Sequence, residues 1–455
     1  MRSAKGFMSK KDGKAMMAPQ KEVVFEQGIH QENFVINIAP DRKYQTILGF
    51  GGAFTETSAY NYSLMSEESK RKIIEAYFDK DKGLGFNFCR THINSSDFSL
   101  SRYTYVEEND EQLATFSIDR DRKYIIPFIK AAREASDELL LFASPWSPPA
   151  WMKSNNDMCH GGRLLEKYYD VWAEYMARYA SEYKKEGIPL FGMSVQNETL
   201  AWQTWESCLY TAQEEAVFVH EHLRPALNRA GFGDVKIMIW DHNKERIYER
   251  MRDSFSVPGV FDDTWGVAFH WYSGDHFAAL DMAHEAFPDK PLVLSEFCLG
   301  ASRKEDVLGS HSSWNGVEQY ARELIGNFNH YMAASVDWNM VVDEEGGPHH
   351  DREGGCKAQI VVDPANDAVS IEPIYYSVAH FSKFIRRGAV RIGSSSFSED
   401  VKAAAFENPD GEIVLVALNC ARKSCGTYLR IGDGTAKVNL PAKSLSTYVI
   451  PPEEQ

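Results

Sequence analysis

Eight short apolar segments alternate with amphipathic segments between residues 46 and 380, and this repeat constrains the fold more than any other feature. The predicted strands are, in chain order, 47–53, 84–90, 138–143, 191–198, 235–240, 266–270, 291–296 and 333–338. Strands that are buried on both faces of a parallel sheet are apolar along their length, and helices connect them. The repeat therefore predicts an α/β fold, a (β/α)8 TIM barrel. A doubly wound open sheet is the competing architecture, but eight units with polar residues at the strand ends favour the barrel.

After about residue 380 the pattern changes to short strands that are separated by Asn-Pro-Asp-Gly and Gly-Asp-Gly turns. These predicted strands are 401–406, 412–418, 426–431 and 444–450. Such a pattern is typical of an antiparallel β domain. Two early β-like runs, 23–25 and 34–38, are predicted to complete it, so we expect an appended antiparallel β-sandwich built from both chain ends. The predicted domains are a mobile N-terminal arm (1–20), sandwich strands (21–45), the catalytic barrel (46–380) and the rest of the sandwich (381–455).

The net charge and the spacing of the cysteines limit which partners and cofactors the protein is expected to bind. A formal net charge of -16 argues against nucleic acid or an anionic membrane as the main partner, because both require a basic surface. Seven cysteines without a CxxC pair predict neither a zinc site nor a disulfide framework, although Cys420 and Cys425 are able to pair in an oxidising compartment. No apolar run has the length of a transmembrane helix or of a signal peptide. We therefore expect a cytoplasmic protein, or a secreted one if a leader has been removed, and no cofactor.

Two glutamates stand at matching places in the predicted barrel. Glu198 ends the fourth strand and Glu296 ends the seventh. Catalytic groups of such barrels lie at the carboxyl ends of the strands, so both side chains are expected to face one cavity. Glycoside hydrolysis uses a pair of carboxylates across a cleft: one protonates the leaving oxygen, and the other attacks the anomeric carbon or activates water. The pair therefore predicts a glycosidase.

Further strand-end residues extend this candidate site. Arg90, His270 and Tyr272 are expected to keep the nucleophile ionised, and Asn197 to bind a sugar hydroxyl. Apolar faces for a sugar ring are expected from Trp146, Trp202, Trp205, Trp271 and Trp338. Each residue also has a structural interpretation: Arg90 as an ion-pair partner, His270 as a core histidine, Asp241 and His242 as polar loop residues, and the aromatic rings as packing.

Two other motifs are weaker. Residues 49–54, Gly-Phe-Gly-Gly-Ala-Phe, resemble a nucleotide-binding loop but lack its final glycine, so we interpret them as a tight barrel strand. The cluster His349-His350-Asp351 offers metal-ligand side chains, but loop clusters of this kind are usually solvated. Two rival functions follow, a non-catalytic carbohydrate-binding barrel and a metal-dependent barrel hydrolase. The second needs several converging ligands, whereas only His270 with Asp241 or His242 is suitably placed.

The chain resembles glycoside hydrolase family 30, in its acid β-glucosidase (glucosylceramidase) branch. The resemblance rests on residues 49–56, Arg90 with 97–99, 143–153, 196–198, 268–272, 295–296, 336–339 and 380–385. It implies a retaining mechanism with Glu198 as acid/base and Glu296 as nucleophile. It also implies that Asp97, Trp146, Asn197 and Trp338 contact the glycone, and that His270 and Tyr272 are partners of the carboxylates. Asn339, next to Trp338, is a further predicted substrate contact.

One departure from the family pattern concerns the leaving-group side. Thr199 stands where the family usually has proline, and the following loop, 200–206, also differs from the family's mammalian members. Trp202 and Trp205 in this loop are predicted to form a sugar platform on the aglycone side, which favours an oligosaccharide aglycone over a lipid. The sequence thus predicts a retaining β-glucosidase of the glucosylceramidase type that acts on a carbohydrate or glycolipid, with a β-1,6-glucanase and a β-xylosidase as open alternatives.

Overall fold

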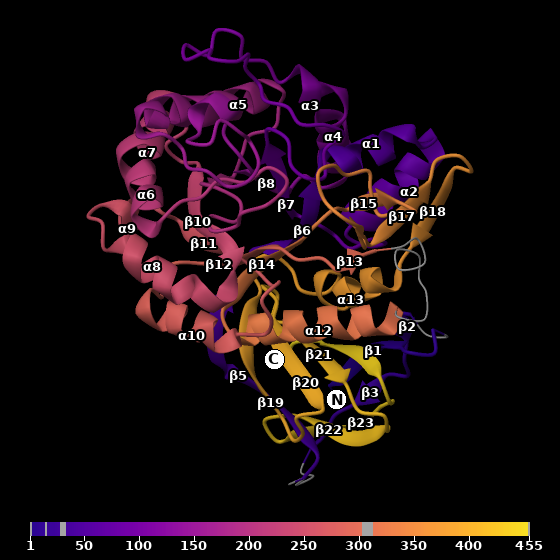
Figure 1. Cartoon of the computed structure of the whole chain (residues 1–455). Coiled ribbons are helices and arrows are strands. Elements are labelled where there is room, and N and C mark those ends of the chain that lie inside the picture. Colours follow the sequence, from indigo (N-terminus) through magenta and orange to yellow (C-terminus); the bar gives the residue numbers. More distant parts are fainter. Residues whose placement is uncertain (1, 14–15, 28–32, 303–312, 454–455) are drawn as a thin grey trace.

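The computed structural model describes residues 2–13, 16–27, 33–302 and 313–453. Eight parallel strands close into a barrel, which confirms the predicted fold class (Figure 1). They are β6 (Gly49–Phe54), β7 (Phe88–Ile93), β8 (Leu140–Pro145), β9 (Gly192–Ser194), β10 (Lys236–Asn243), β11 (Gly266–His270), β12 (Leu292–Glu296) and β14 (Met332–Asp337). Neighbours pair in chain order, and β14 pairs with β6 to close the ring.

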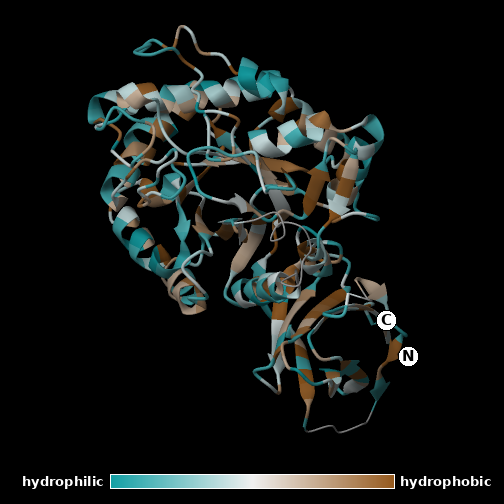
Figure 2. Cartoon of the chain, turned by 45° about the vertical axis from the view of Figure 1, so that its right-hand side comes forward, coloured by the Kyte–Doolittle hydropathy of each residue, from teal (hydrophilic) through white to brown (hydrophobic). Residues whose placement is uncertain are grey.

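Helices surround the barrel, and their hydrophilic outer faces contrast with the hydrophobic strands (Figure 2). The helices are α1 (Glu56–Leu64), α2 (Glu67–Phe78), α3 (Asp119–Lys123), α4 (Ile125–Ala135), α5 (Tyr169–Lys185), α6 (Ala212–Val217), α7 (Arg224–Arg229), α8 (Ile247–Phe255), α9 (Val260–Asp263), α10 (Phe277–Ala286), α12 (Ser313–Asn329) and α13 (Pro373–Ser382). Short helical turns are η1 (Ala150–Met152), η2 (Glu166–Tyr168), the π-helical η3 (Phe218–Leu223) and η4 (Lys244–Arg246). In the described ranges, no helix is long and apolar enough to span a membrane.

Local sequence explains the start of α6 and the close packing of β6. Thr211 and Glu214 form a capping box at the start of α6, so each side chain satisfies a backbone N–H of the other residue. In β6, a side chain at Gly51 would place its Cβ 1.8 Å from the carbonyl oxygen of Phe88. Only glycine permits this approach of two strands, and residues 49–54 are therefore a barrel strand and not a nucleotide loop.

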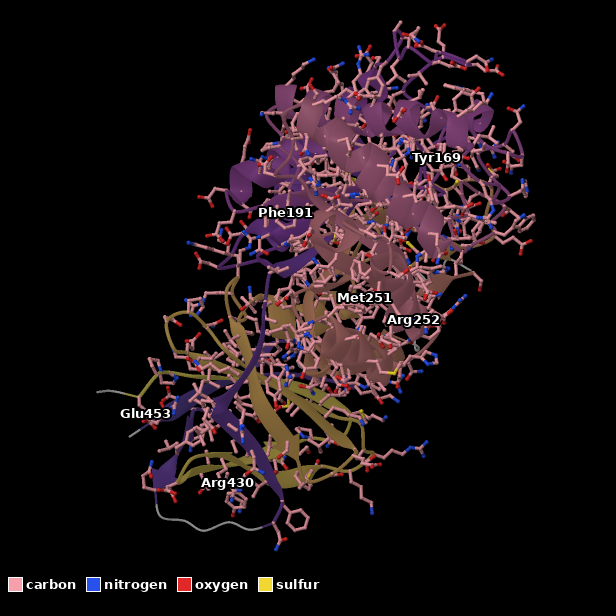
Figure 3. The ribbon with its side chains drawn as sticks, turned by 90° about the vertical axis from the view of Figure 1, so that its left-hand side faces the viewer. Tyr169, Phe191, Met251, Arg252, Arg430 and Glu453 are labelled. Atoms are coloured by element: carbon pink, nitrogen blue, oxygen red, sulfur yellow. The ribbon has the colours of Figure 1, made fainter. Side chains whose placement is uncertain are left out.

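A second domain is formed by the two ends of the chain, with the barrel inserted between them. Its strands are β1 (Ser3–Lys10), β2 (Ala18–Pro19), β3 (Val23–Val24), β4 (Glu26–Gln27), β5 (Val35–Thr46), β19 (Val390–Ser396), β20 (Val401–Glu407), β21 (Ile413–Asn419), β22 (Cys425–Ile431), β23 (Gly434–Leu440) and β24 (Ser444–Ile450). They form one hydrogen-bonded sheet around its own apolar core, which includes Ile36, Leu415 and Leu429. Figure 3 shows this sandwich, with Arg430 and Glu453, beside the barrel, with Tyr169 and Met251.

The N-terminal segment differs from the prediction. Residues 1–20 were expected to form a mobile arm, but β1 pairs with β24 over six residues and with β2. The inward residues of β1 are small or polar (Ala4, Gly6 and Ser9), so the segment lacks the apolar alternation by which a strand is recognised. The sandwich also contains β19 and β23, which were not predicted, and its β5–β22 pair is parallel.

Two small sheets are formed by segments that follow the strand ends of the barrel. β13 (Gly300–Ala301) pairs with β16 (Gly355–Cys356). β15 (Val341–Asp343), β17 (Ile360–Asp363) and β18 (Ala368–Ile371) form a three-stranded sheet. All seven cysteines, including Cys420 and Cys425, are free thiols.

The barrel joins the sandwich through α12 and α13, which lie between the two domains (Figure 1). His380 on α13 is fully buried at this junction. Its Nδ1 lies 2.8 Å from the Thr447 hydroxyl and its Nε2 lies 2.9 Å from the Ser9 hydroxyl. Burial lowers the pKa of His380 to about 3, so the folded protein keeps this imidazole neutral.

This histidine predicts a loss of stability in acid. Between pH 6.5 and 3 the unfolded chain binds a proton at His380 that the folded chain does not, so stability falls as the pH falls. The expected slope is about 1.4 kcal/mol per pH unit. His380→Gln should flatten the fall of the thermal unfolding midpoint between pH 7 and pH 4.5, whereas His276→Gln, at an exposed site, should not. An unchanged pH dependence in His380→Gln would contradict this assignment.

Candidate active site

Glu198 and Glu296 lie across one cavity at the carboxyl ends of the barrel strands. Glu296 is the last residue of β12, and Glu198 follows β9. A carboxylate oxygen of each, together with a ring nitrogen of His270, falls within a group of atoms that are all within 4.8 Å of one another. The backbone of Glu198 is left-handed (φ 51°), and its N–H donates to the carbonyl oxygen of Asp241. The barrel thus brings the two predicted carboxylates together.

Glu296 is held tightly. Its Oε2 accepts from Arg90 Nη1 at 2.6 Å, and its Oε1 accepts from the Tyr272 hydroxyl at 2.9 Å. The Glu296 side chain is 9% exposed and that of Arg90 is fully buried. A short charge-assisted bond and a phenol donor therefore fix both oxygens of Glu296.

All three nitrogens of the Arg90 guanidinium donate hydrogen bonds in this site. Besides Glu296, it donates to Asn197 Oδ1 (2.8 Å), Asp241 Oδ2 (2.8 Å), the Ser144 hydroxyl (3.0 Å) and the carbonyl oxygen of Ser295 (3.4 Å). Because all of its N–H groups are engaged, its position is fixed relative to three barrel strands.

Asp241 is a central residue that the sequence interpretation did not select. Its Oδ2 accepts from Arg90 and from the hydroxyls of Ser144 and Ser194, and its Oδ1 lies 2.5 Å from the Ser295 hydroxyl and 3.0 Å from His270 Nε2. Burial opposes its charge, but Arg90 and His270 outweigh burial and lower the pKa of Asp241. Only its position at the end of a predicted strand pointed to it.

Glu198 is held more loosely than Glu296. Its Oε1 lies 3.3 Å from His270 Nδ1, and Gln203 Nε2 donates to its Oε2 at 3.4 Å. Burial raises the pKa of Glu198, but the hydrogen bonds from His270 and Gln203 and the electrostatic effect of His242 and His270 together outweigh burial and lower it to about 2. Burial lowers the pKa of His270, but Glu296, Asp241 and Glu198 together raise it to about 9. The Glu198–His270 pair therefore holds one proton, which rests on His270.

An aromatic and charged wall adjoins the carboxylates. Trp146 and Trp338 stack with ring centroids 5.0 Å apart, and Arg90 lies over both rings. Asp97 is 4% exposed, and its Oδ2 accepts from Arg352 Nη1 at 2.8 Å. Burial raises the pKa of Asp97 to about 6 despite this ion pair. Arg352 was not predicted, because it comes from the loop between β15 and β16 and not from a residue directly after a predicted barrel strand.

The predicted aglycone residues lie at the rim. Trp202 is 61% exposed, and its ring centroid lies 5.1 Å from that of His160. Trp205 is half-buried beneath the guanidinium of Arg352. Trp271 packs in the core against Tyr320 and Phe297.

Two predicted site residues have no exposed surface. His270 is enclosed by Glu198 and Asp241. Asn339 accepts from the Thr55 hydroxyl at 2.6 Å and lies 3.4 Å from the thiol of Cys356. Direct substrate contact by these two residues stays a prediction; in this structure each side chain is buried and supports other residues.

The possible metal ligands are engaged elsewhere. In the His349-His350-Asp351 cluster, His350 Nε2 lies 3.0 Å from a carboxylate oxygen of buried Glu206. Glu198, His270 and Glu296 are also spaced for a metal ion. However, Arg90 and Tyr272 already occupy both oxygens of Glu296, and the guanidinium supplies the positive charge that a metal would bring. The donors around Glu296 suit a hydrogen-bonded carboxylate nucleophile better than a metal ligand.

Comparisons with known proteins agree with this geometry. The model of the glycosyl hydrolase family 30 TIM-barrel domain matches residues 47–385, and that of the family 30 beta sandwich domain matches residues 388–448. Among curated relatives, putative glucosylceramidase 4 of Caenorhabditis elegans is 34% identical over 83% of this chain and 75% of its own length. The lysosomal acid glucosylceramidase of Mus musculus is 31% identical over 91% and 83%.

Solved structures extend the comparison. SrfJ from Salmonella typhimurium matches with a TM-score of 0.95 and 34% identity, over 99% of this chain and 100% of that one. The endo-beta1,6-glucanase BT3312 matches with a TM-score of 0.86 and 26% identity, over 100% of both chains.

Proposed function

Because the chain belongs to glycosyl hydrolase family 30 and is a glycoside hydrolase, we propose that it hydrolyses a β-glucoside by double displacement, with Glu296 as nucleophile and Glu198 as acid/base. The observation that carries this assignment is the approach of the two carboxylates to within 4.8 Å. Retaining enzymes place their carboxyl groups about 5–5.5 Å apart, whereas inverting enzymes leave room for a water molecule.

In the first half-reaction, Glu296 attacks the anomeric carbon while the leaving oxygen is protonated. Arg90 and Tyr272 hold the Glu296 carboxylate and aim its oxygens. Glu198 delivers a proton that it receives from His270 Nδ1, 3.3 Å away. His270 is able to release this proton and stay in place, because its Nε2–H still donates to Asp241. The bond to the aglycone breaks, and its electron pair takes up this proton.

In the second half-reaction, Glu198 is the base. It takes a proton from water, the water oxygen bonds to the anomeric carbon, and the bond from that carbon to Glu296 breaks with its electron pair returning to the carboxylate. The proton on Glu198 then returns to His270. The glycone is bound against Trp146 and Trp338, with Asp97 and Asn197 as hydroxyl acceptors.

The residues at the rim of the cavity favour a substrate with an apolar aglycone. Leu200 and Trp202 are exposed in the loop that follows Glu198, and they offer apolar surface to a leaving group. A glucosylceramide-type substrate therefore ranks first, in keeping with the names of the 34% and 31% identical relatives. A β-1,6-glucan is the second candidate, because tryptophan rings also bind sugars and a glucanase shares the fold at 26% identity. A β-xyloside, the substrate of a β-xylosidase, is the third candidate.

A substrate panel tests this ranking. Initial rates should be compared on glucosylceramide, gentiobiose, a β-1,6-glucan, and the aryl β-glucoside, xyloside and galactoside. The expected result is the highest kcat/KM on glucosylceramide among the natural substrates, and aryl glucoside ahead of aryl xyloside. Higher kcat/KM on the glucan would move the assignment to the second candidate, and a faster xyloside would overturn the glucose specificity.

Trp202 gives a further prediction. Trp202→Ala should lower kcat/KM on a glucoside with an apolar aglycone about 10-fold through KM, because it removes a ring face from the leaving-group side. The rate on methyl β-glucoside should change little. Phe34→Ala removes an equally exposed ring (59%) from the sandwich and serves as the control. Equal losses on both substrates would show that Trp202 does not bind the aglycone.

A further inference from the structure

His242 follows an unusual piece of backbone. Trp240 and Asp241, the two residues before it, are both left-handed, with φ values of 75° and 48°. The pairing of β10 with β11 shifts by one residue at this point, as in a β-bulge. A bulge re-aims side chains, and here both Asp241 and His242 approach the catalytic groups: Asp241 contacts Arg90, and His242 approaches Glu198.

The surrounding structure fixes this bulge. The backbone N–H of Trp240 donates to Glu215 Oε1 at 3.0 Å, and buried Arg250 donates to Oε2 of the same carboxylate at 2.8 Å. The ring centroid of His242 lies 5.1 Å from that of Trp240. Backbone strain that is held by buried partners is concentrated at functional sites, so the placement of His242 needs an explanation.

The imidazole has an unused hydrogen-bonding atom. Nδ1 of His242 is buried and has no hydrogen-bond partner in the part of the chain that the structure describes. It lies 3.8 Å from Glu198 Oε1, which is too long for a hydrogen bond. A small movement of either side chain would close this gap, and catalytic bonds often tighten only during the reaction.

The reaction creates a need for this bond. After His270 has passed its proton to Glu198, its Nε2–H remains on Asp241 and its Nδ1 no longer donates to Glu198. When Glu198 has protonated the leaving group, it is therefore an ionised carboxylate that has lost its main donor. Gln203, at 3.4 Å, remains as a weak one.

The charge state of His242 suits this task. Glu198, Asp241, His270 and Glu245 face its ring. Burial, aided by the charge of His270, outweighs the attraction of the three carboxylates and lowers the pKa of His242. The ring is therefore neutral near pH 7. A neutral N–H holds a carboxylate in place, whereas an imidazolium would suppress its ability to take a proton from water.

With Glu198 taken as the acid/base, as proposed above, we infer that His242 is a positioning residue of the second half-reaction. Its Nδ1–H donates to Glu198 Oε1 once the leaving group has departed, and it holds the carboxylate in line with the attacking water. His242 itself neither gains nor loses a proton, since the proton from water goes to Glu198.

Two variants separate this role from a structural one. His242→Phe keeps a ring against Trp240 but removes the donor, and His242→Gln keeps a donor. Pre-steady-state kinetics on an aryl β-glucoside with a good leaving group measure the burst (glycosylation) and the steady state (deglycosylation) separately, and the burst amplitude counts the folded active sites. His242→Phe should slow deglycosylation about 10-fold or more, the value of one hydrogen bond to a charged group, with glycosylation within about 2-fold. His242→Gln should restore most of the deglycosylation rate.

Equal slowing of both steps in His242→Phe, no slowing of either, or no rescue by His242→Gln would overturn the inference. Its failure is distinct from a failure of the proposed function, which is tested by Glu296→Gln. If Glu296→Gln is inactive and the two steps respond equally to His242→Phe, only the role of His242 is lost.

Discussion

Glu296→Gln should lower kcat/KM by a factor on the order of 10⁴ or more, because an amide does not form the glycosyl–enzyme bond that double displacement requires. The change keeps the size of the side chain but turns an acceptor of the Arg90 and Tyr272 hydrogen bonds into a partial donor. Arg90 then loses one of its two buried carboxylate partners, so a modest fall in the thermal unfolding midpoint is also expected.

The matched control is Glu249→Gln on α8, which removes an exposed glutamate and should leave kcat/KM unchanged. Residual activity of Glu296→Gln should be measured on preparations free of wild-type protein, with an aryl β-glucoside. Wild-type turnover in Glu296→Gln would remove this residue from the chemistry. A loss of activity with a large loss of folded protein would call for Glu296→Asp, which keeps the charge but withdraws it from the anomeric carbon and should also be strongly impaired.

The barrel was predictable from sequence because both faces of its strands are buried. Segments such as Leu292–Glu296 are apolar until their last residues, so the strand and the carboxylate that ends it are visible together. The strand β1 was not predictable for the opposite reason. Its inward positions hold Ala4, Gly6 and Ser9, and the pairing with β24 that makes it a strand joins opposite ends of the chain.

The residues of the candidate site also divide into those that the sequence predicts and those that it does not. Glu198, Glu296 and Arg90 follow from a rule about strand ends, which needs only the strand boundaries. The role of Asp241 depends on a β-bulge that no local residue pattern encodes, since Trp240 is a poor candidate for left-handed backbone. Arg352 reaches Asp97 across 255 residues of sequence. Contacts of this kind depend on tertiary packing and appear only once the fold is known.

Glu198→Ala should separate the two half-reactions, because the acid and the base are the same residue. General acid/base catalysis contributes about 10²–10⁴-fold. For a glucoside with a poor leaving group, kcat/KM should fall by this amount, since no proton reaches the departing oxygen. With a good leaving group, glycosylation should be nearly normal and deglycosylation slow, so the covalent intermediate accumulates.

Mass spectrometry of quenched Glu198→Ala should then show a glycosyl adduct on the peptide that contains Glu296. Azide fits the space left by the carboxylate and needs no base, so it should accelerate turnover and yield the β-glycosyl azide, the product of a second inversion. The Glu206→Ala variant is a useful comparison, because it removes a buried carboxylate that pairs with His350 and lies outside the proposed chemistry. An adduct on another residue, or an α-azide product, would contradict a double displacement at Glu296 and with it the interpretation of the 4.8 Å approach as a retaining pair.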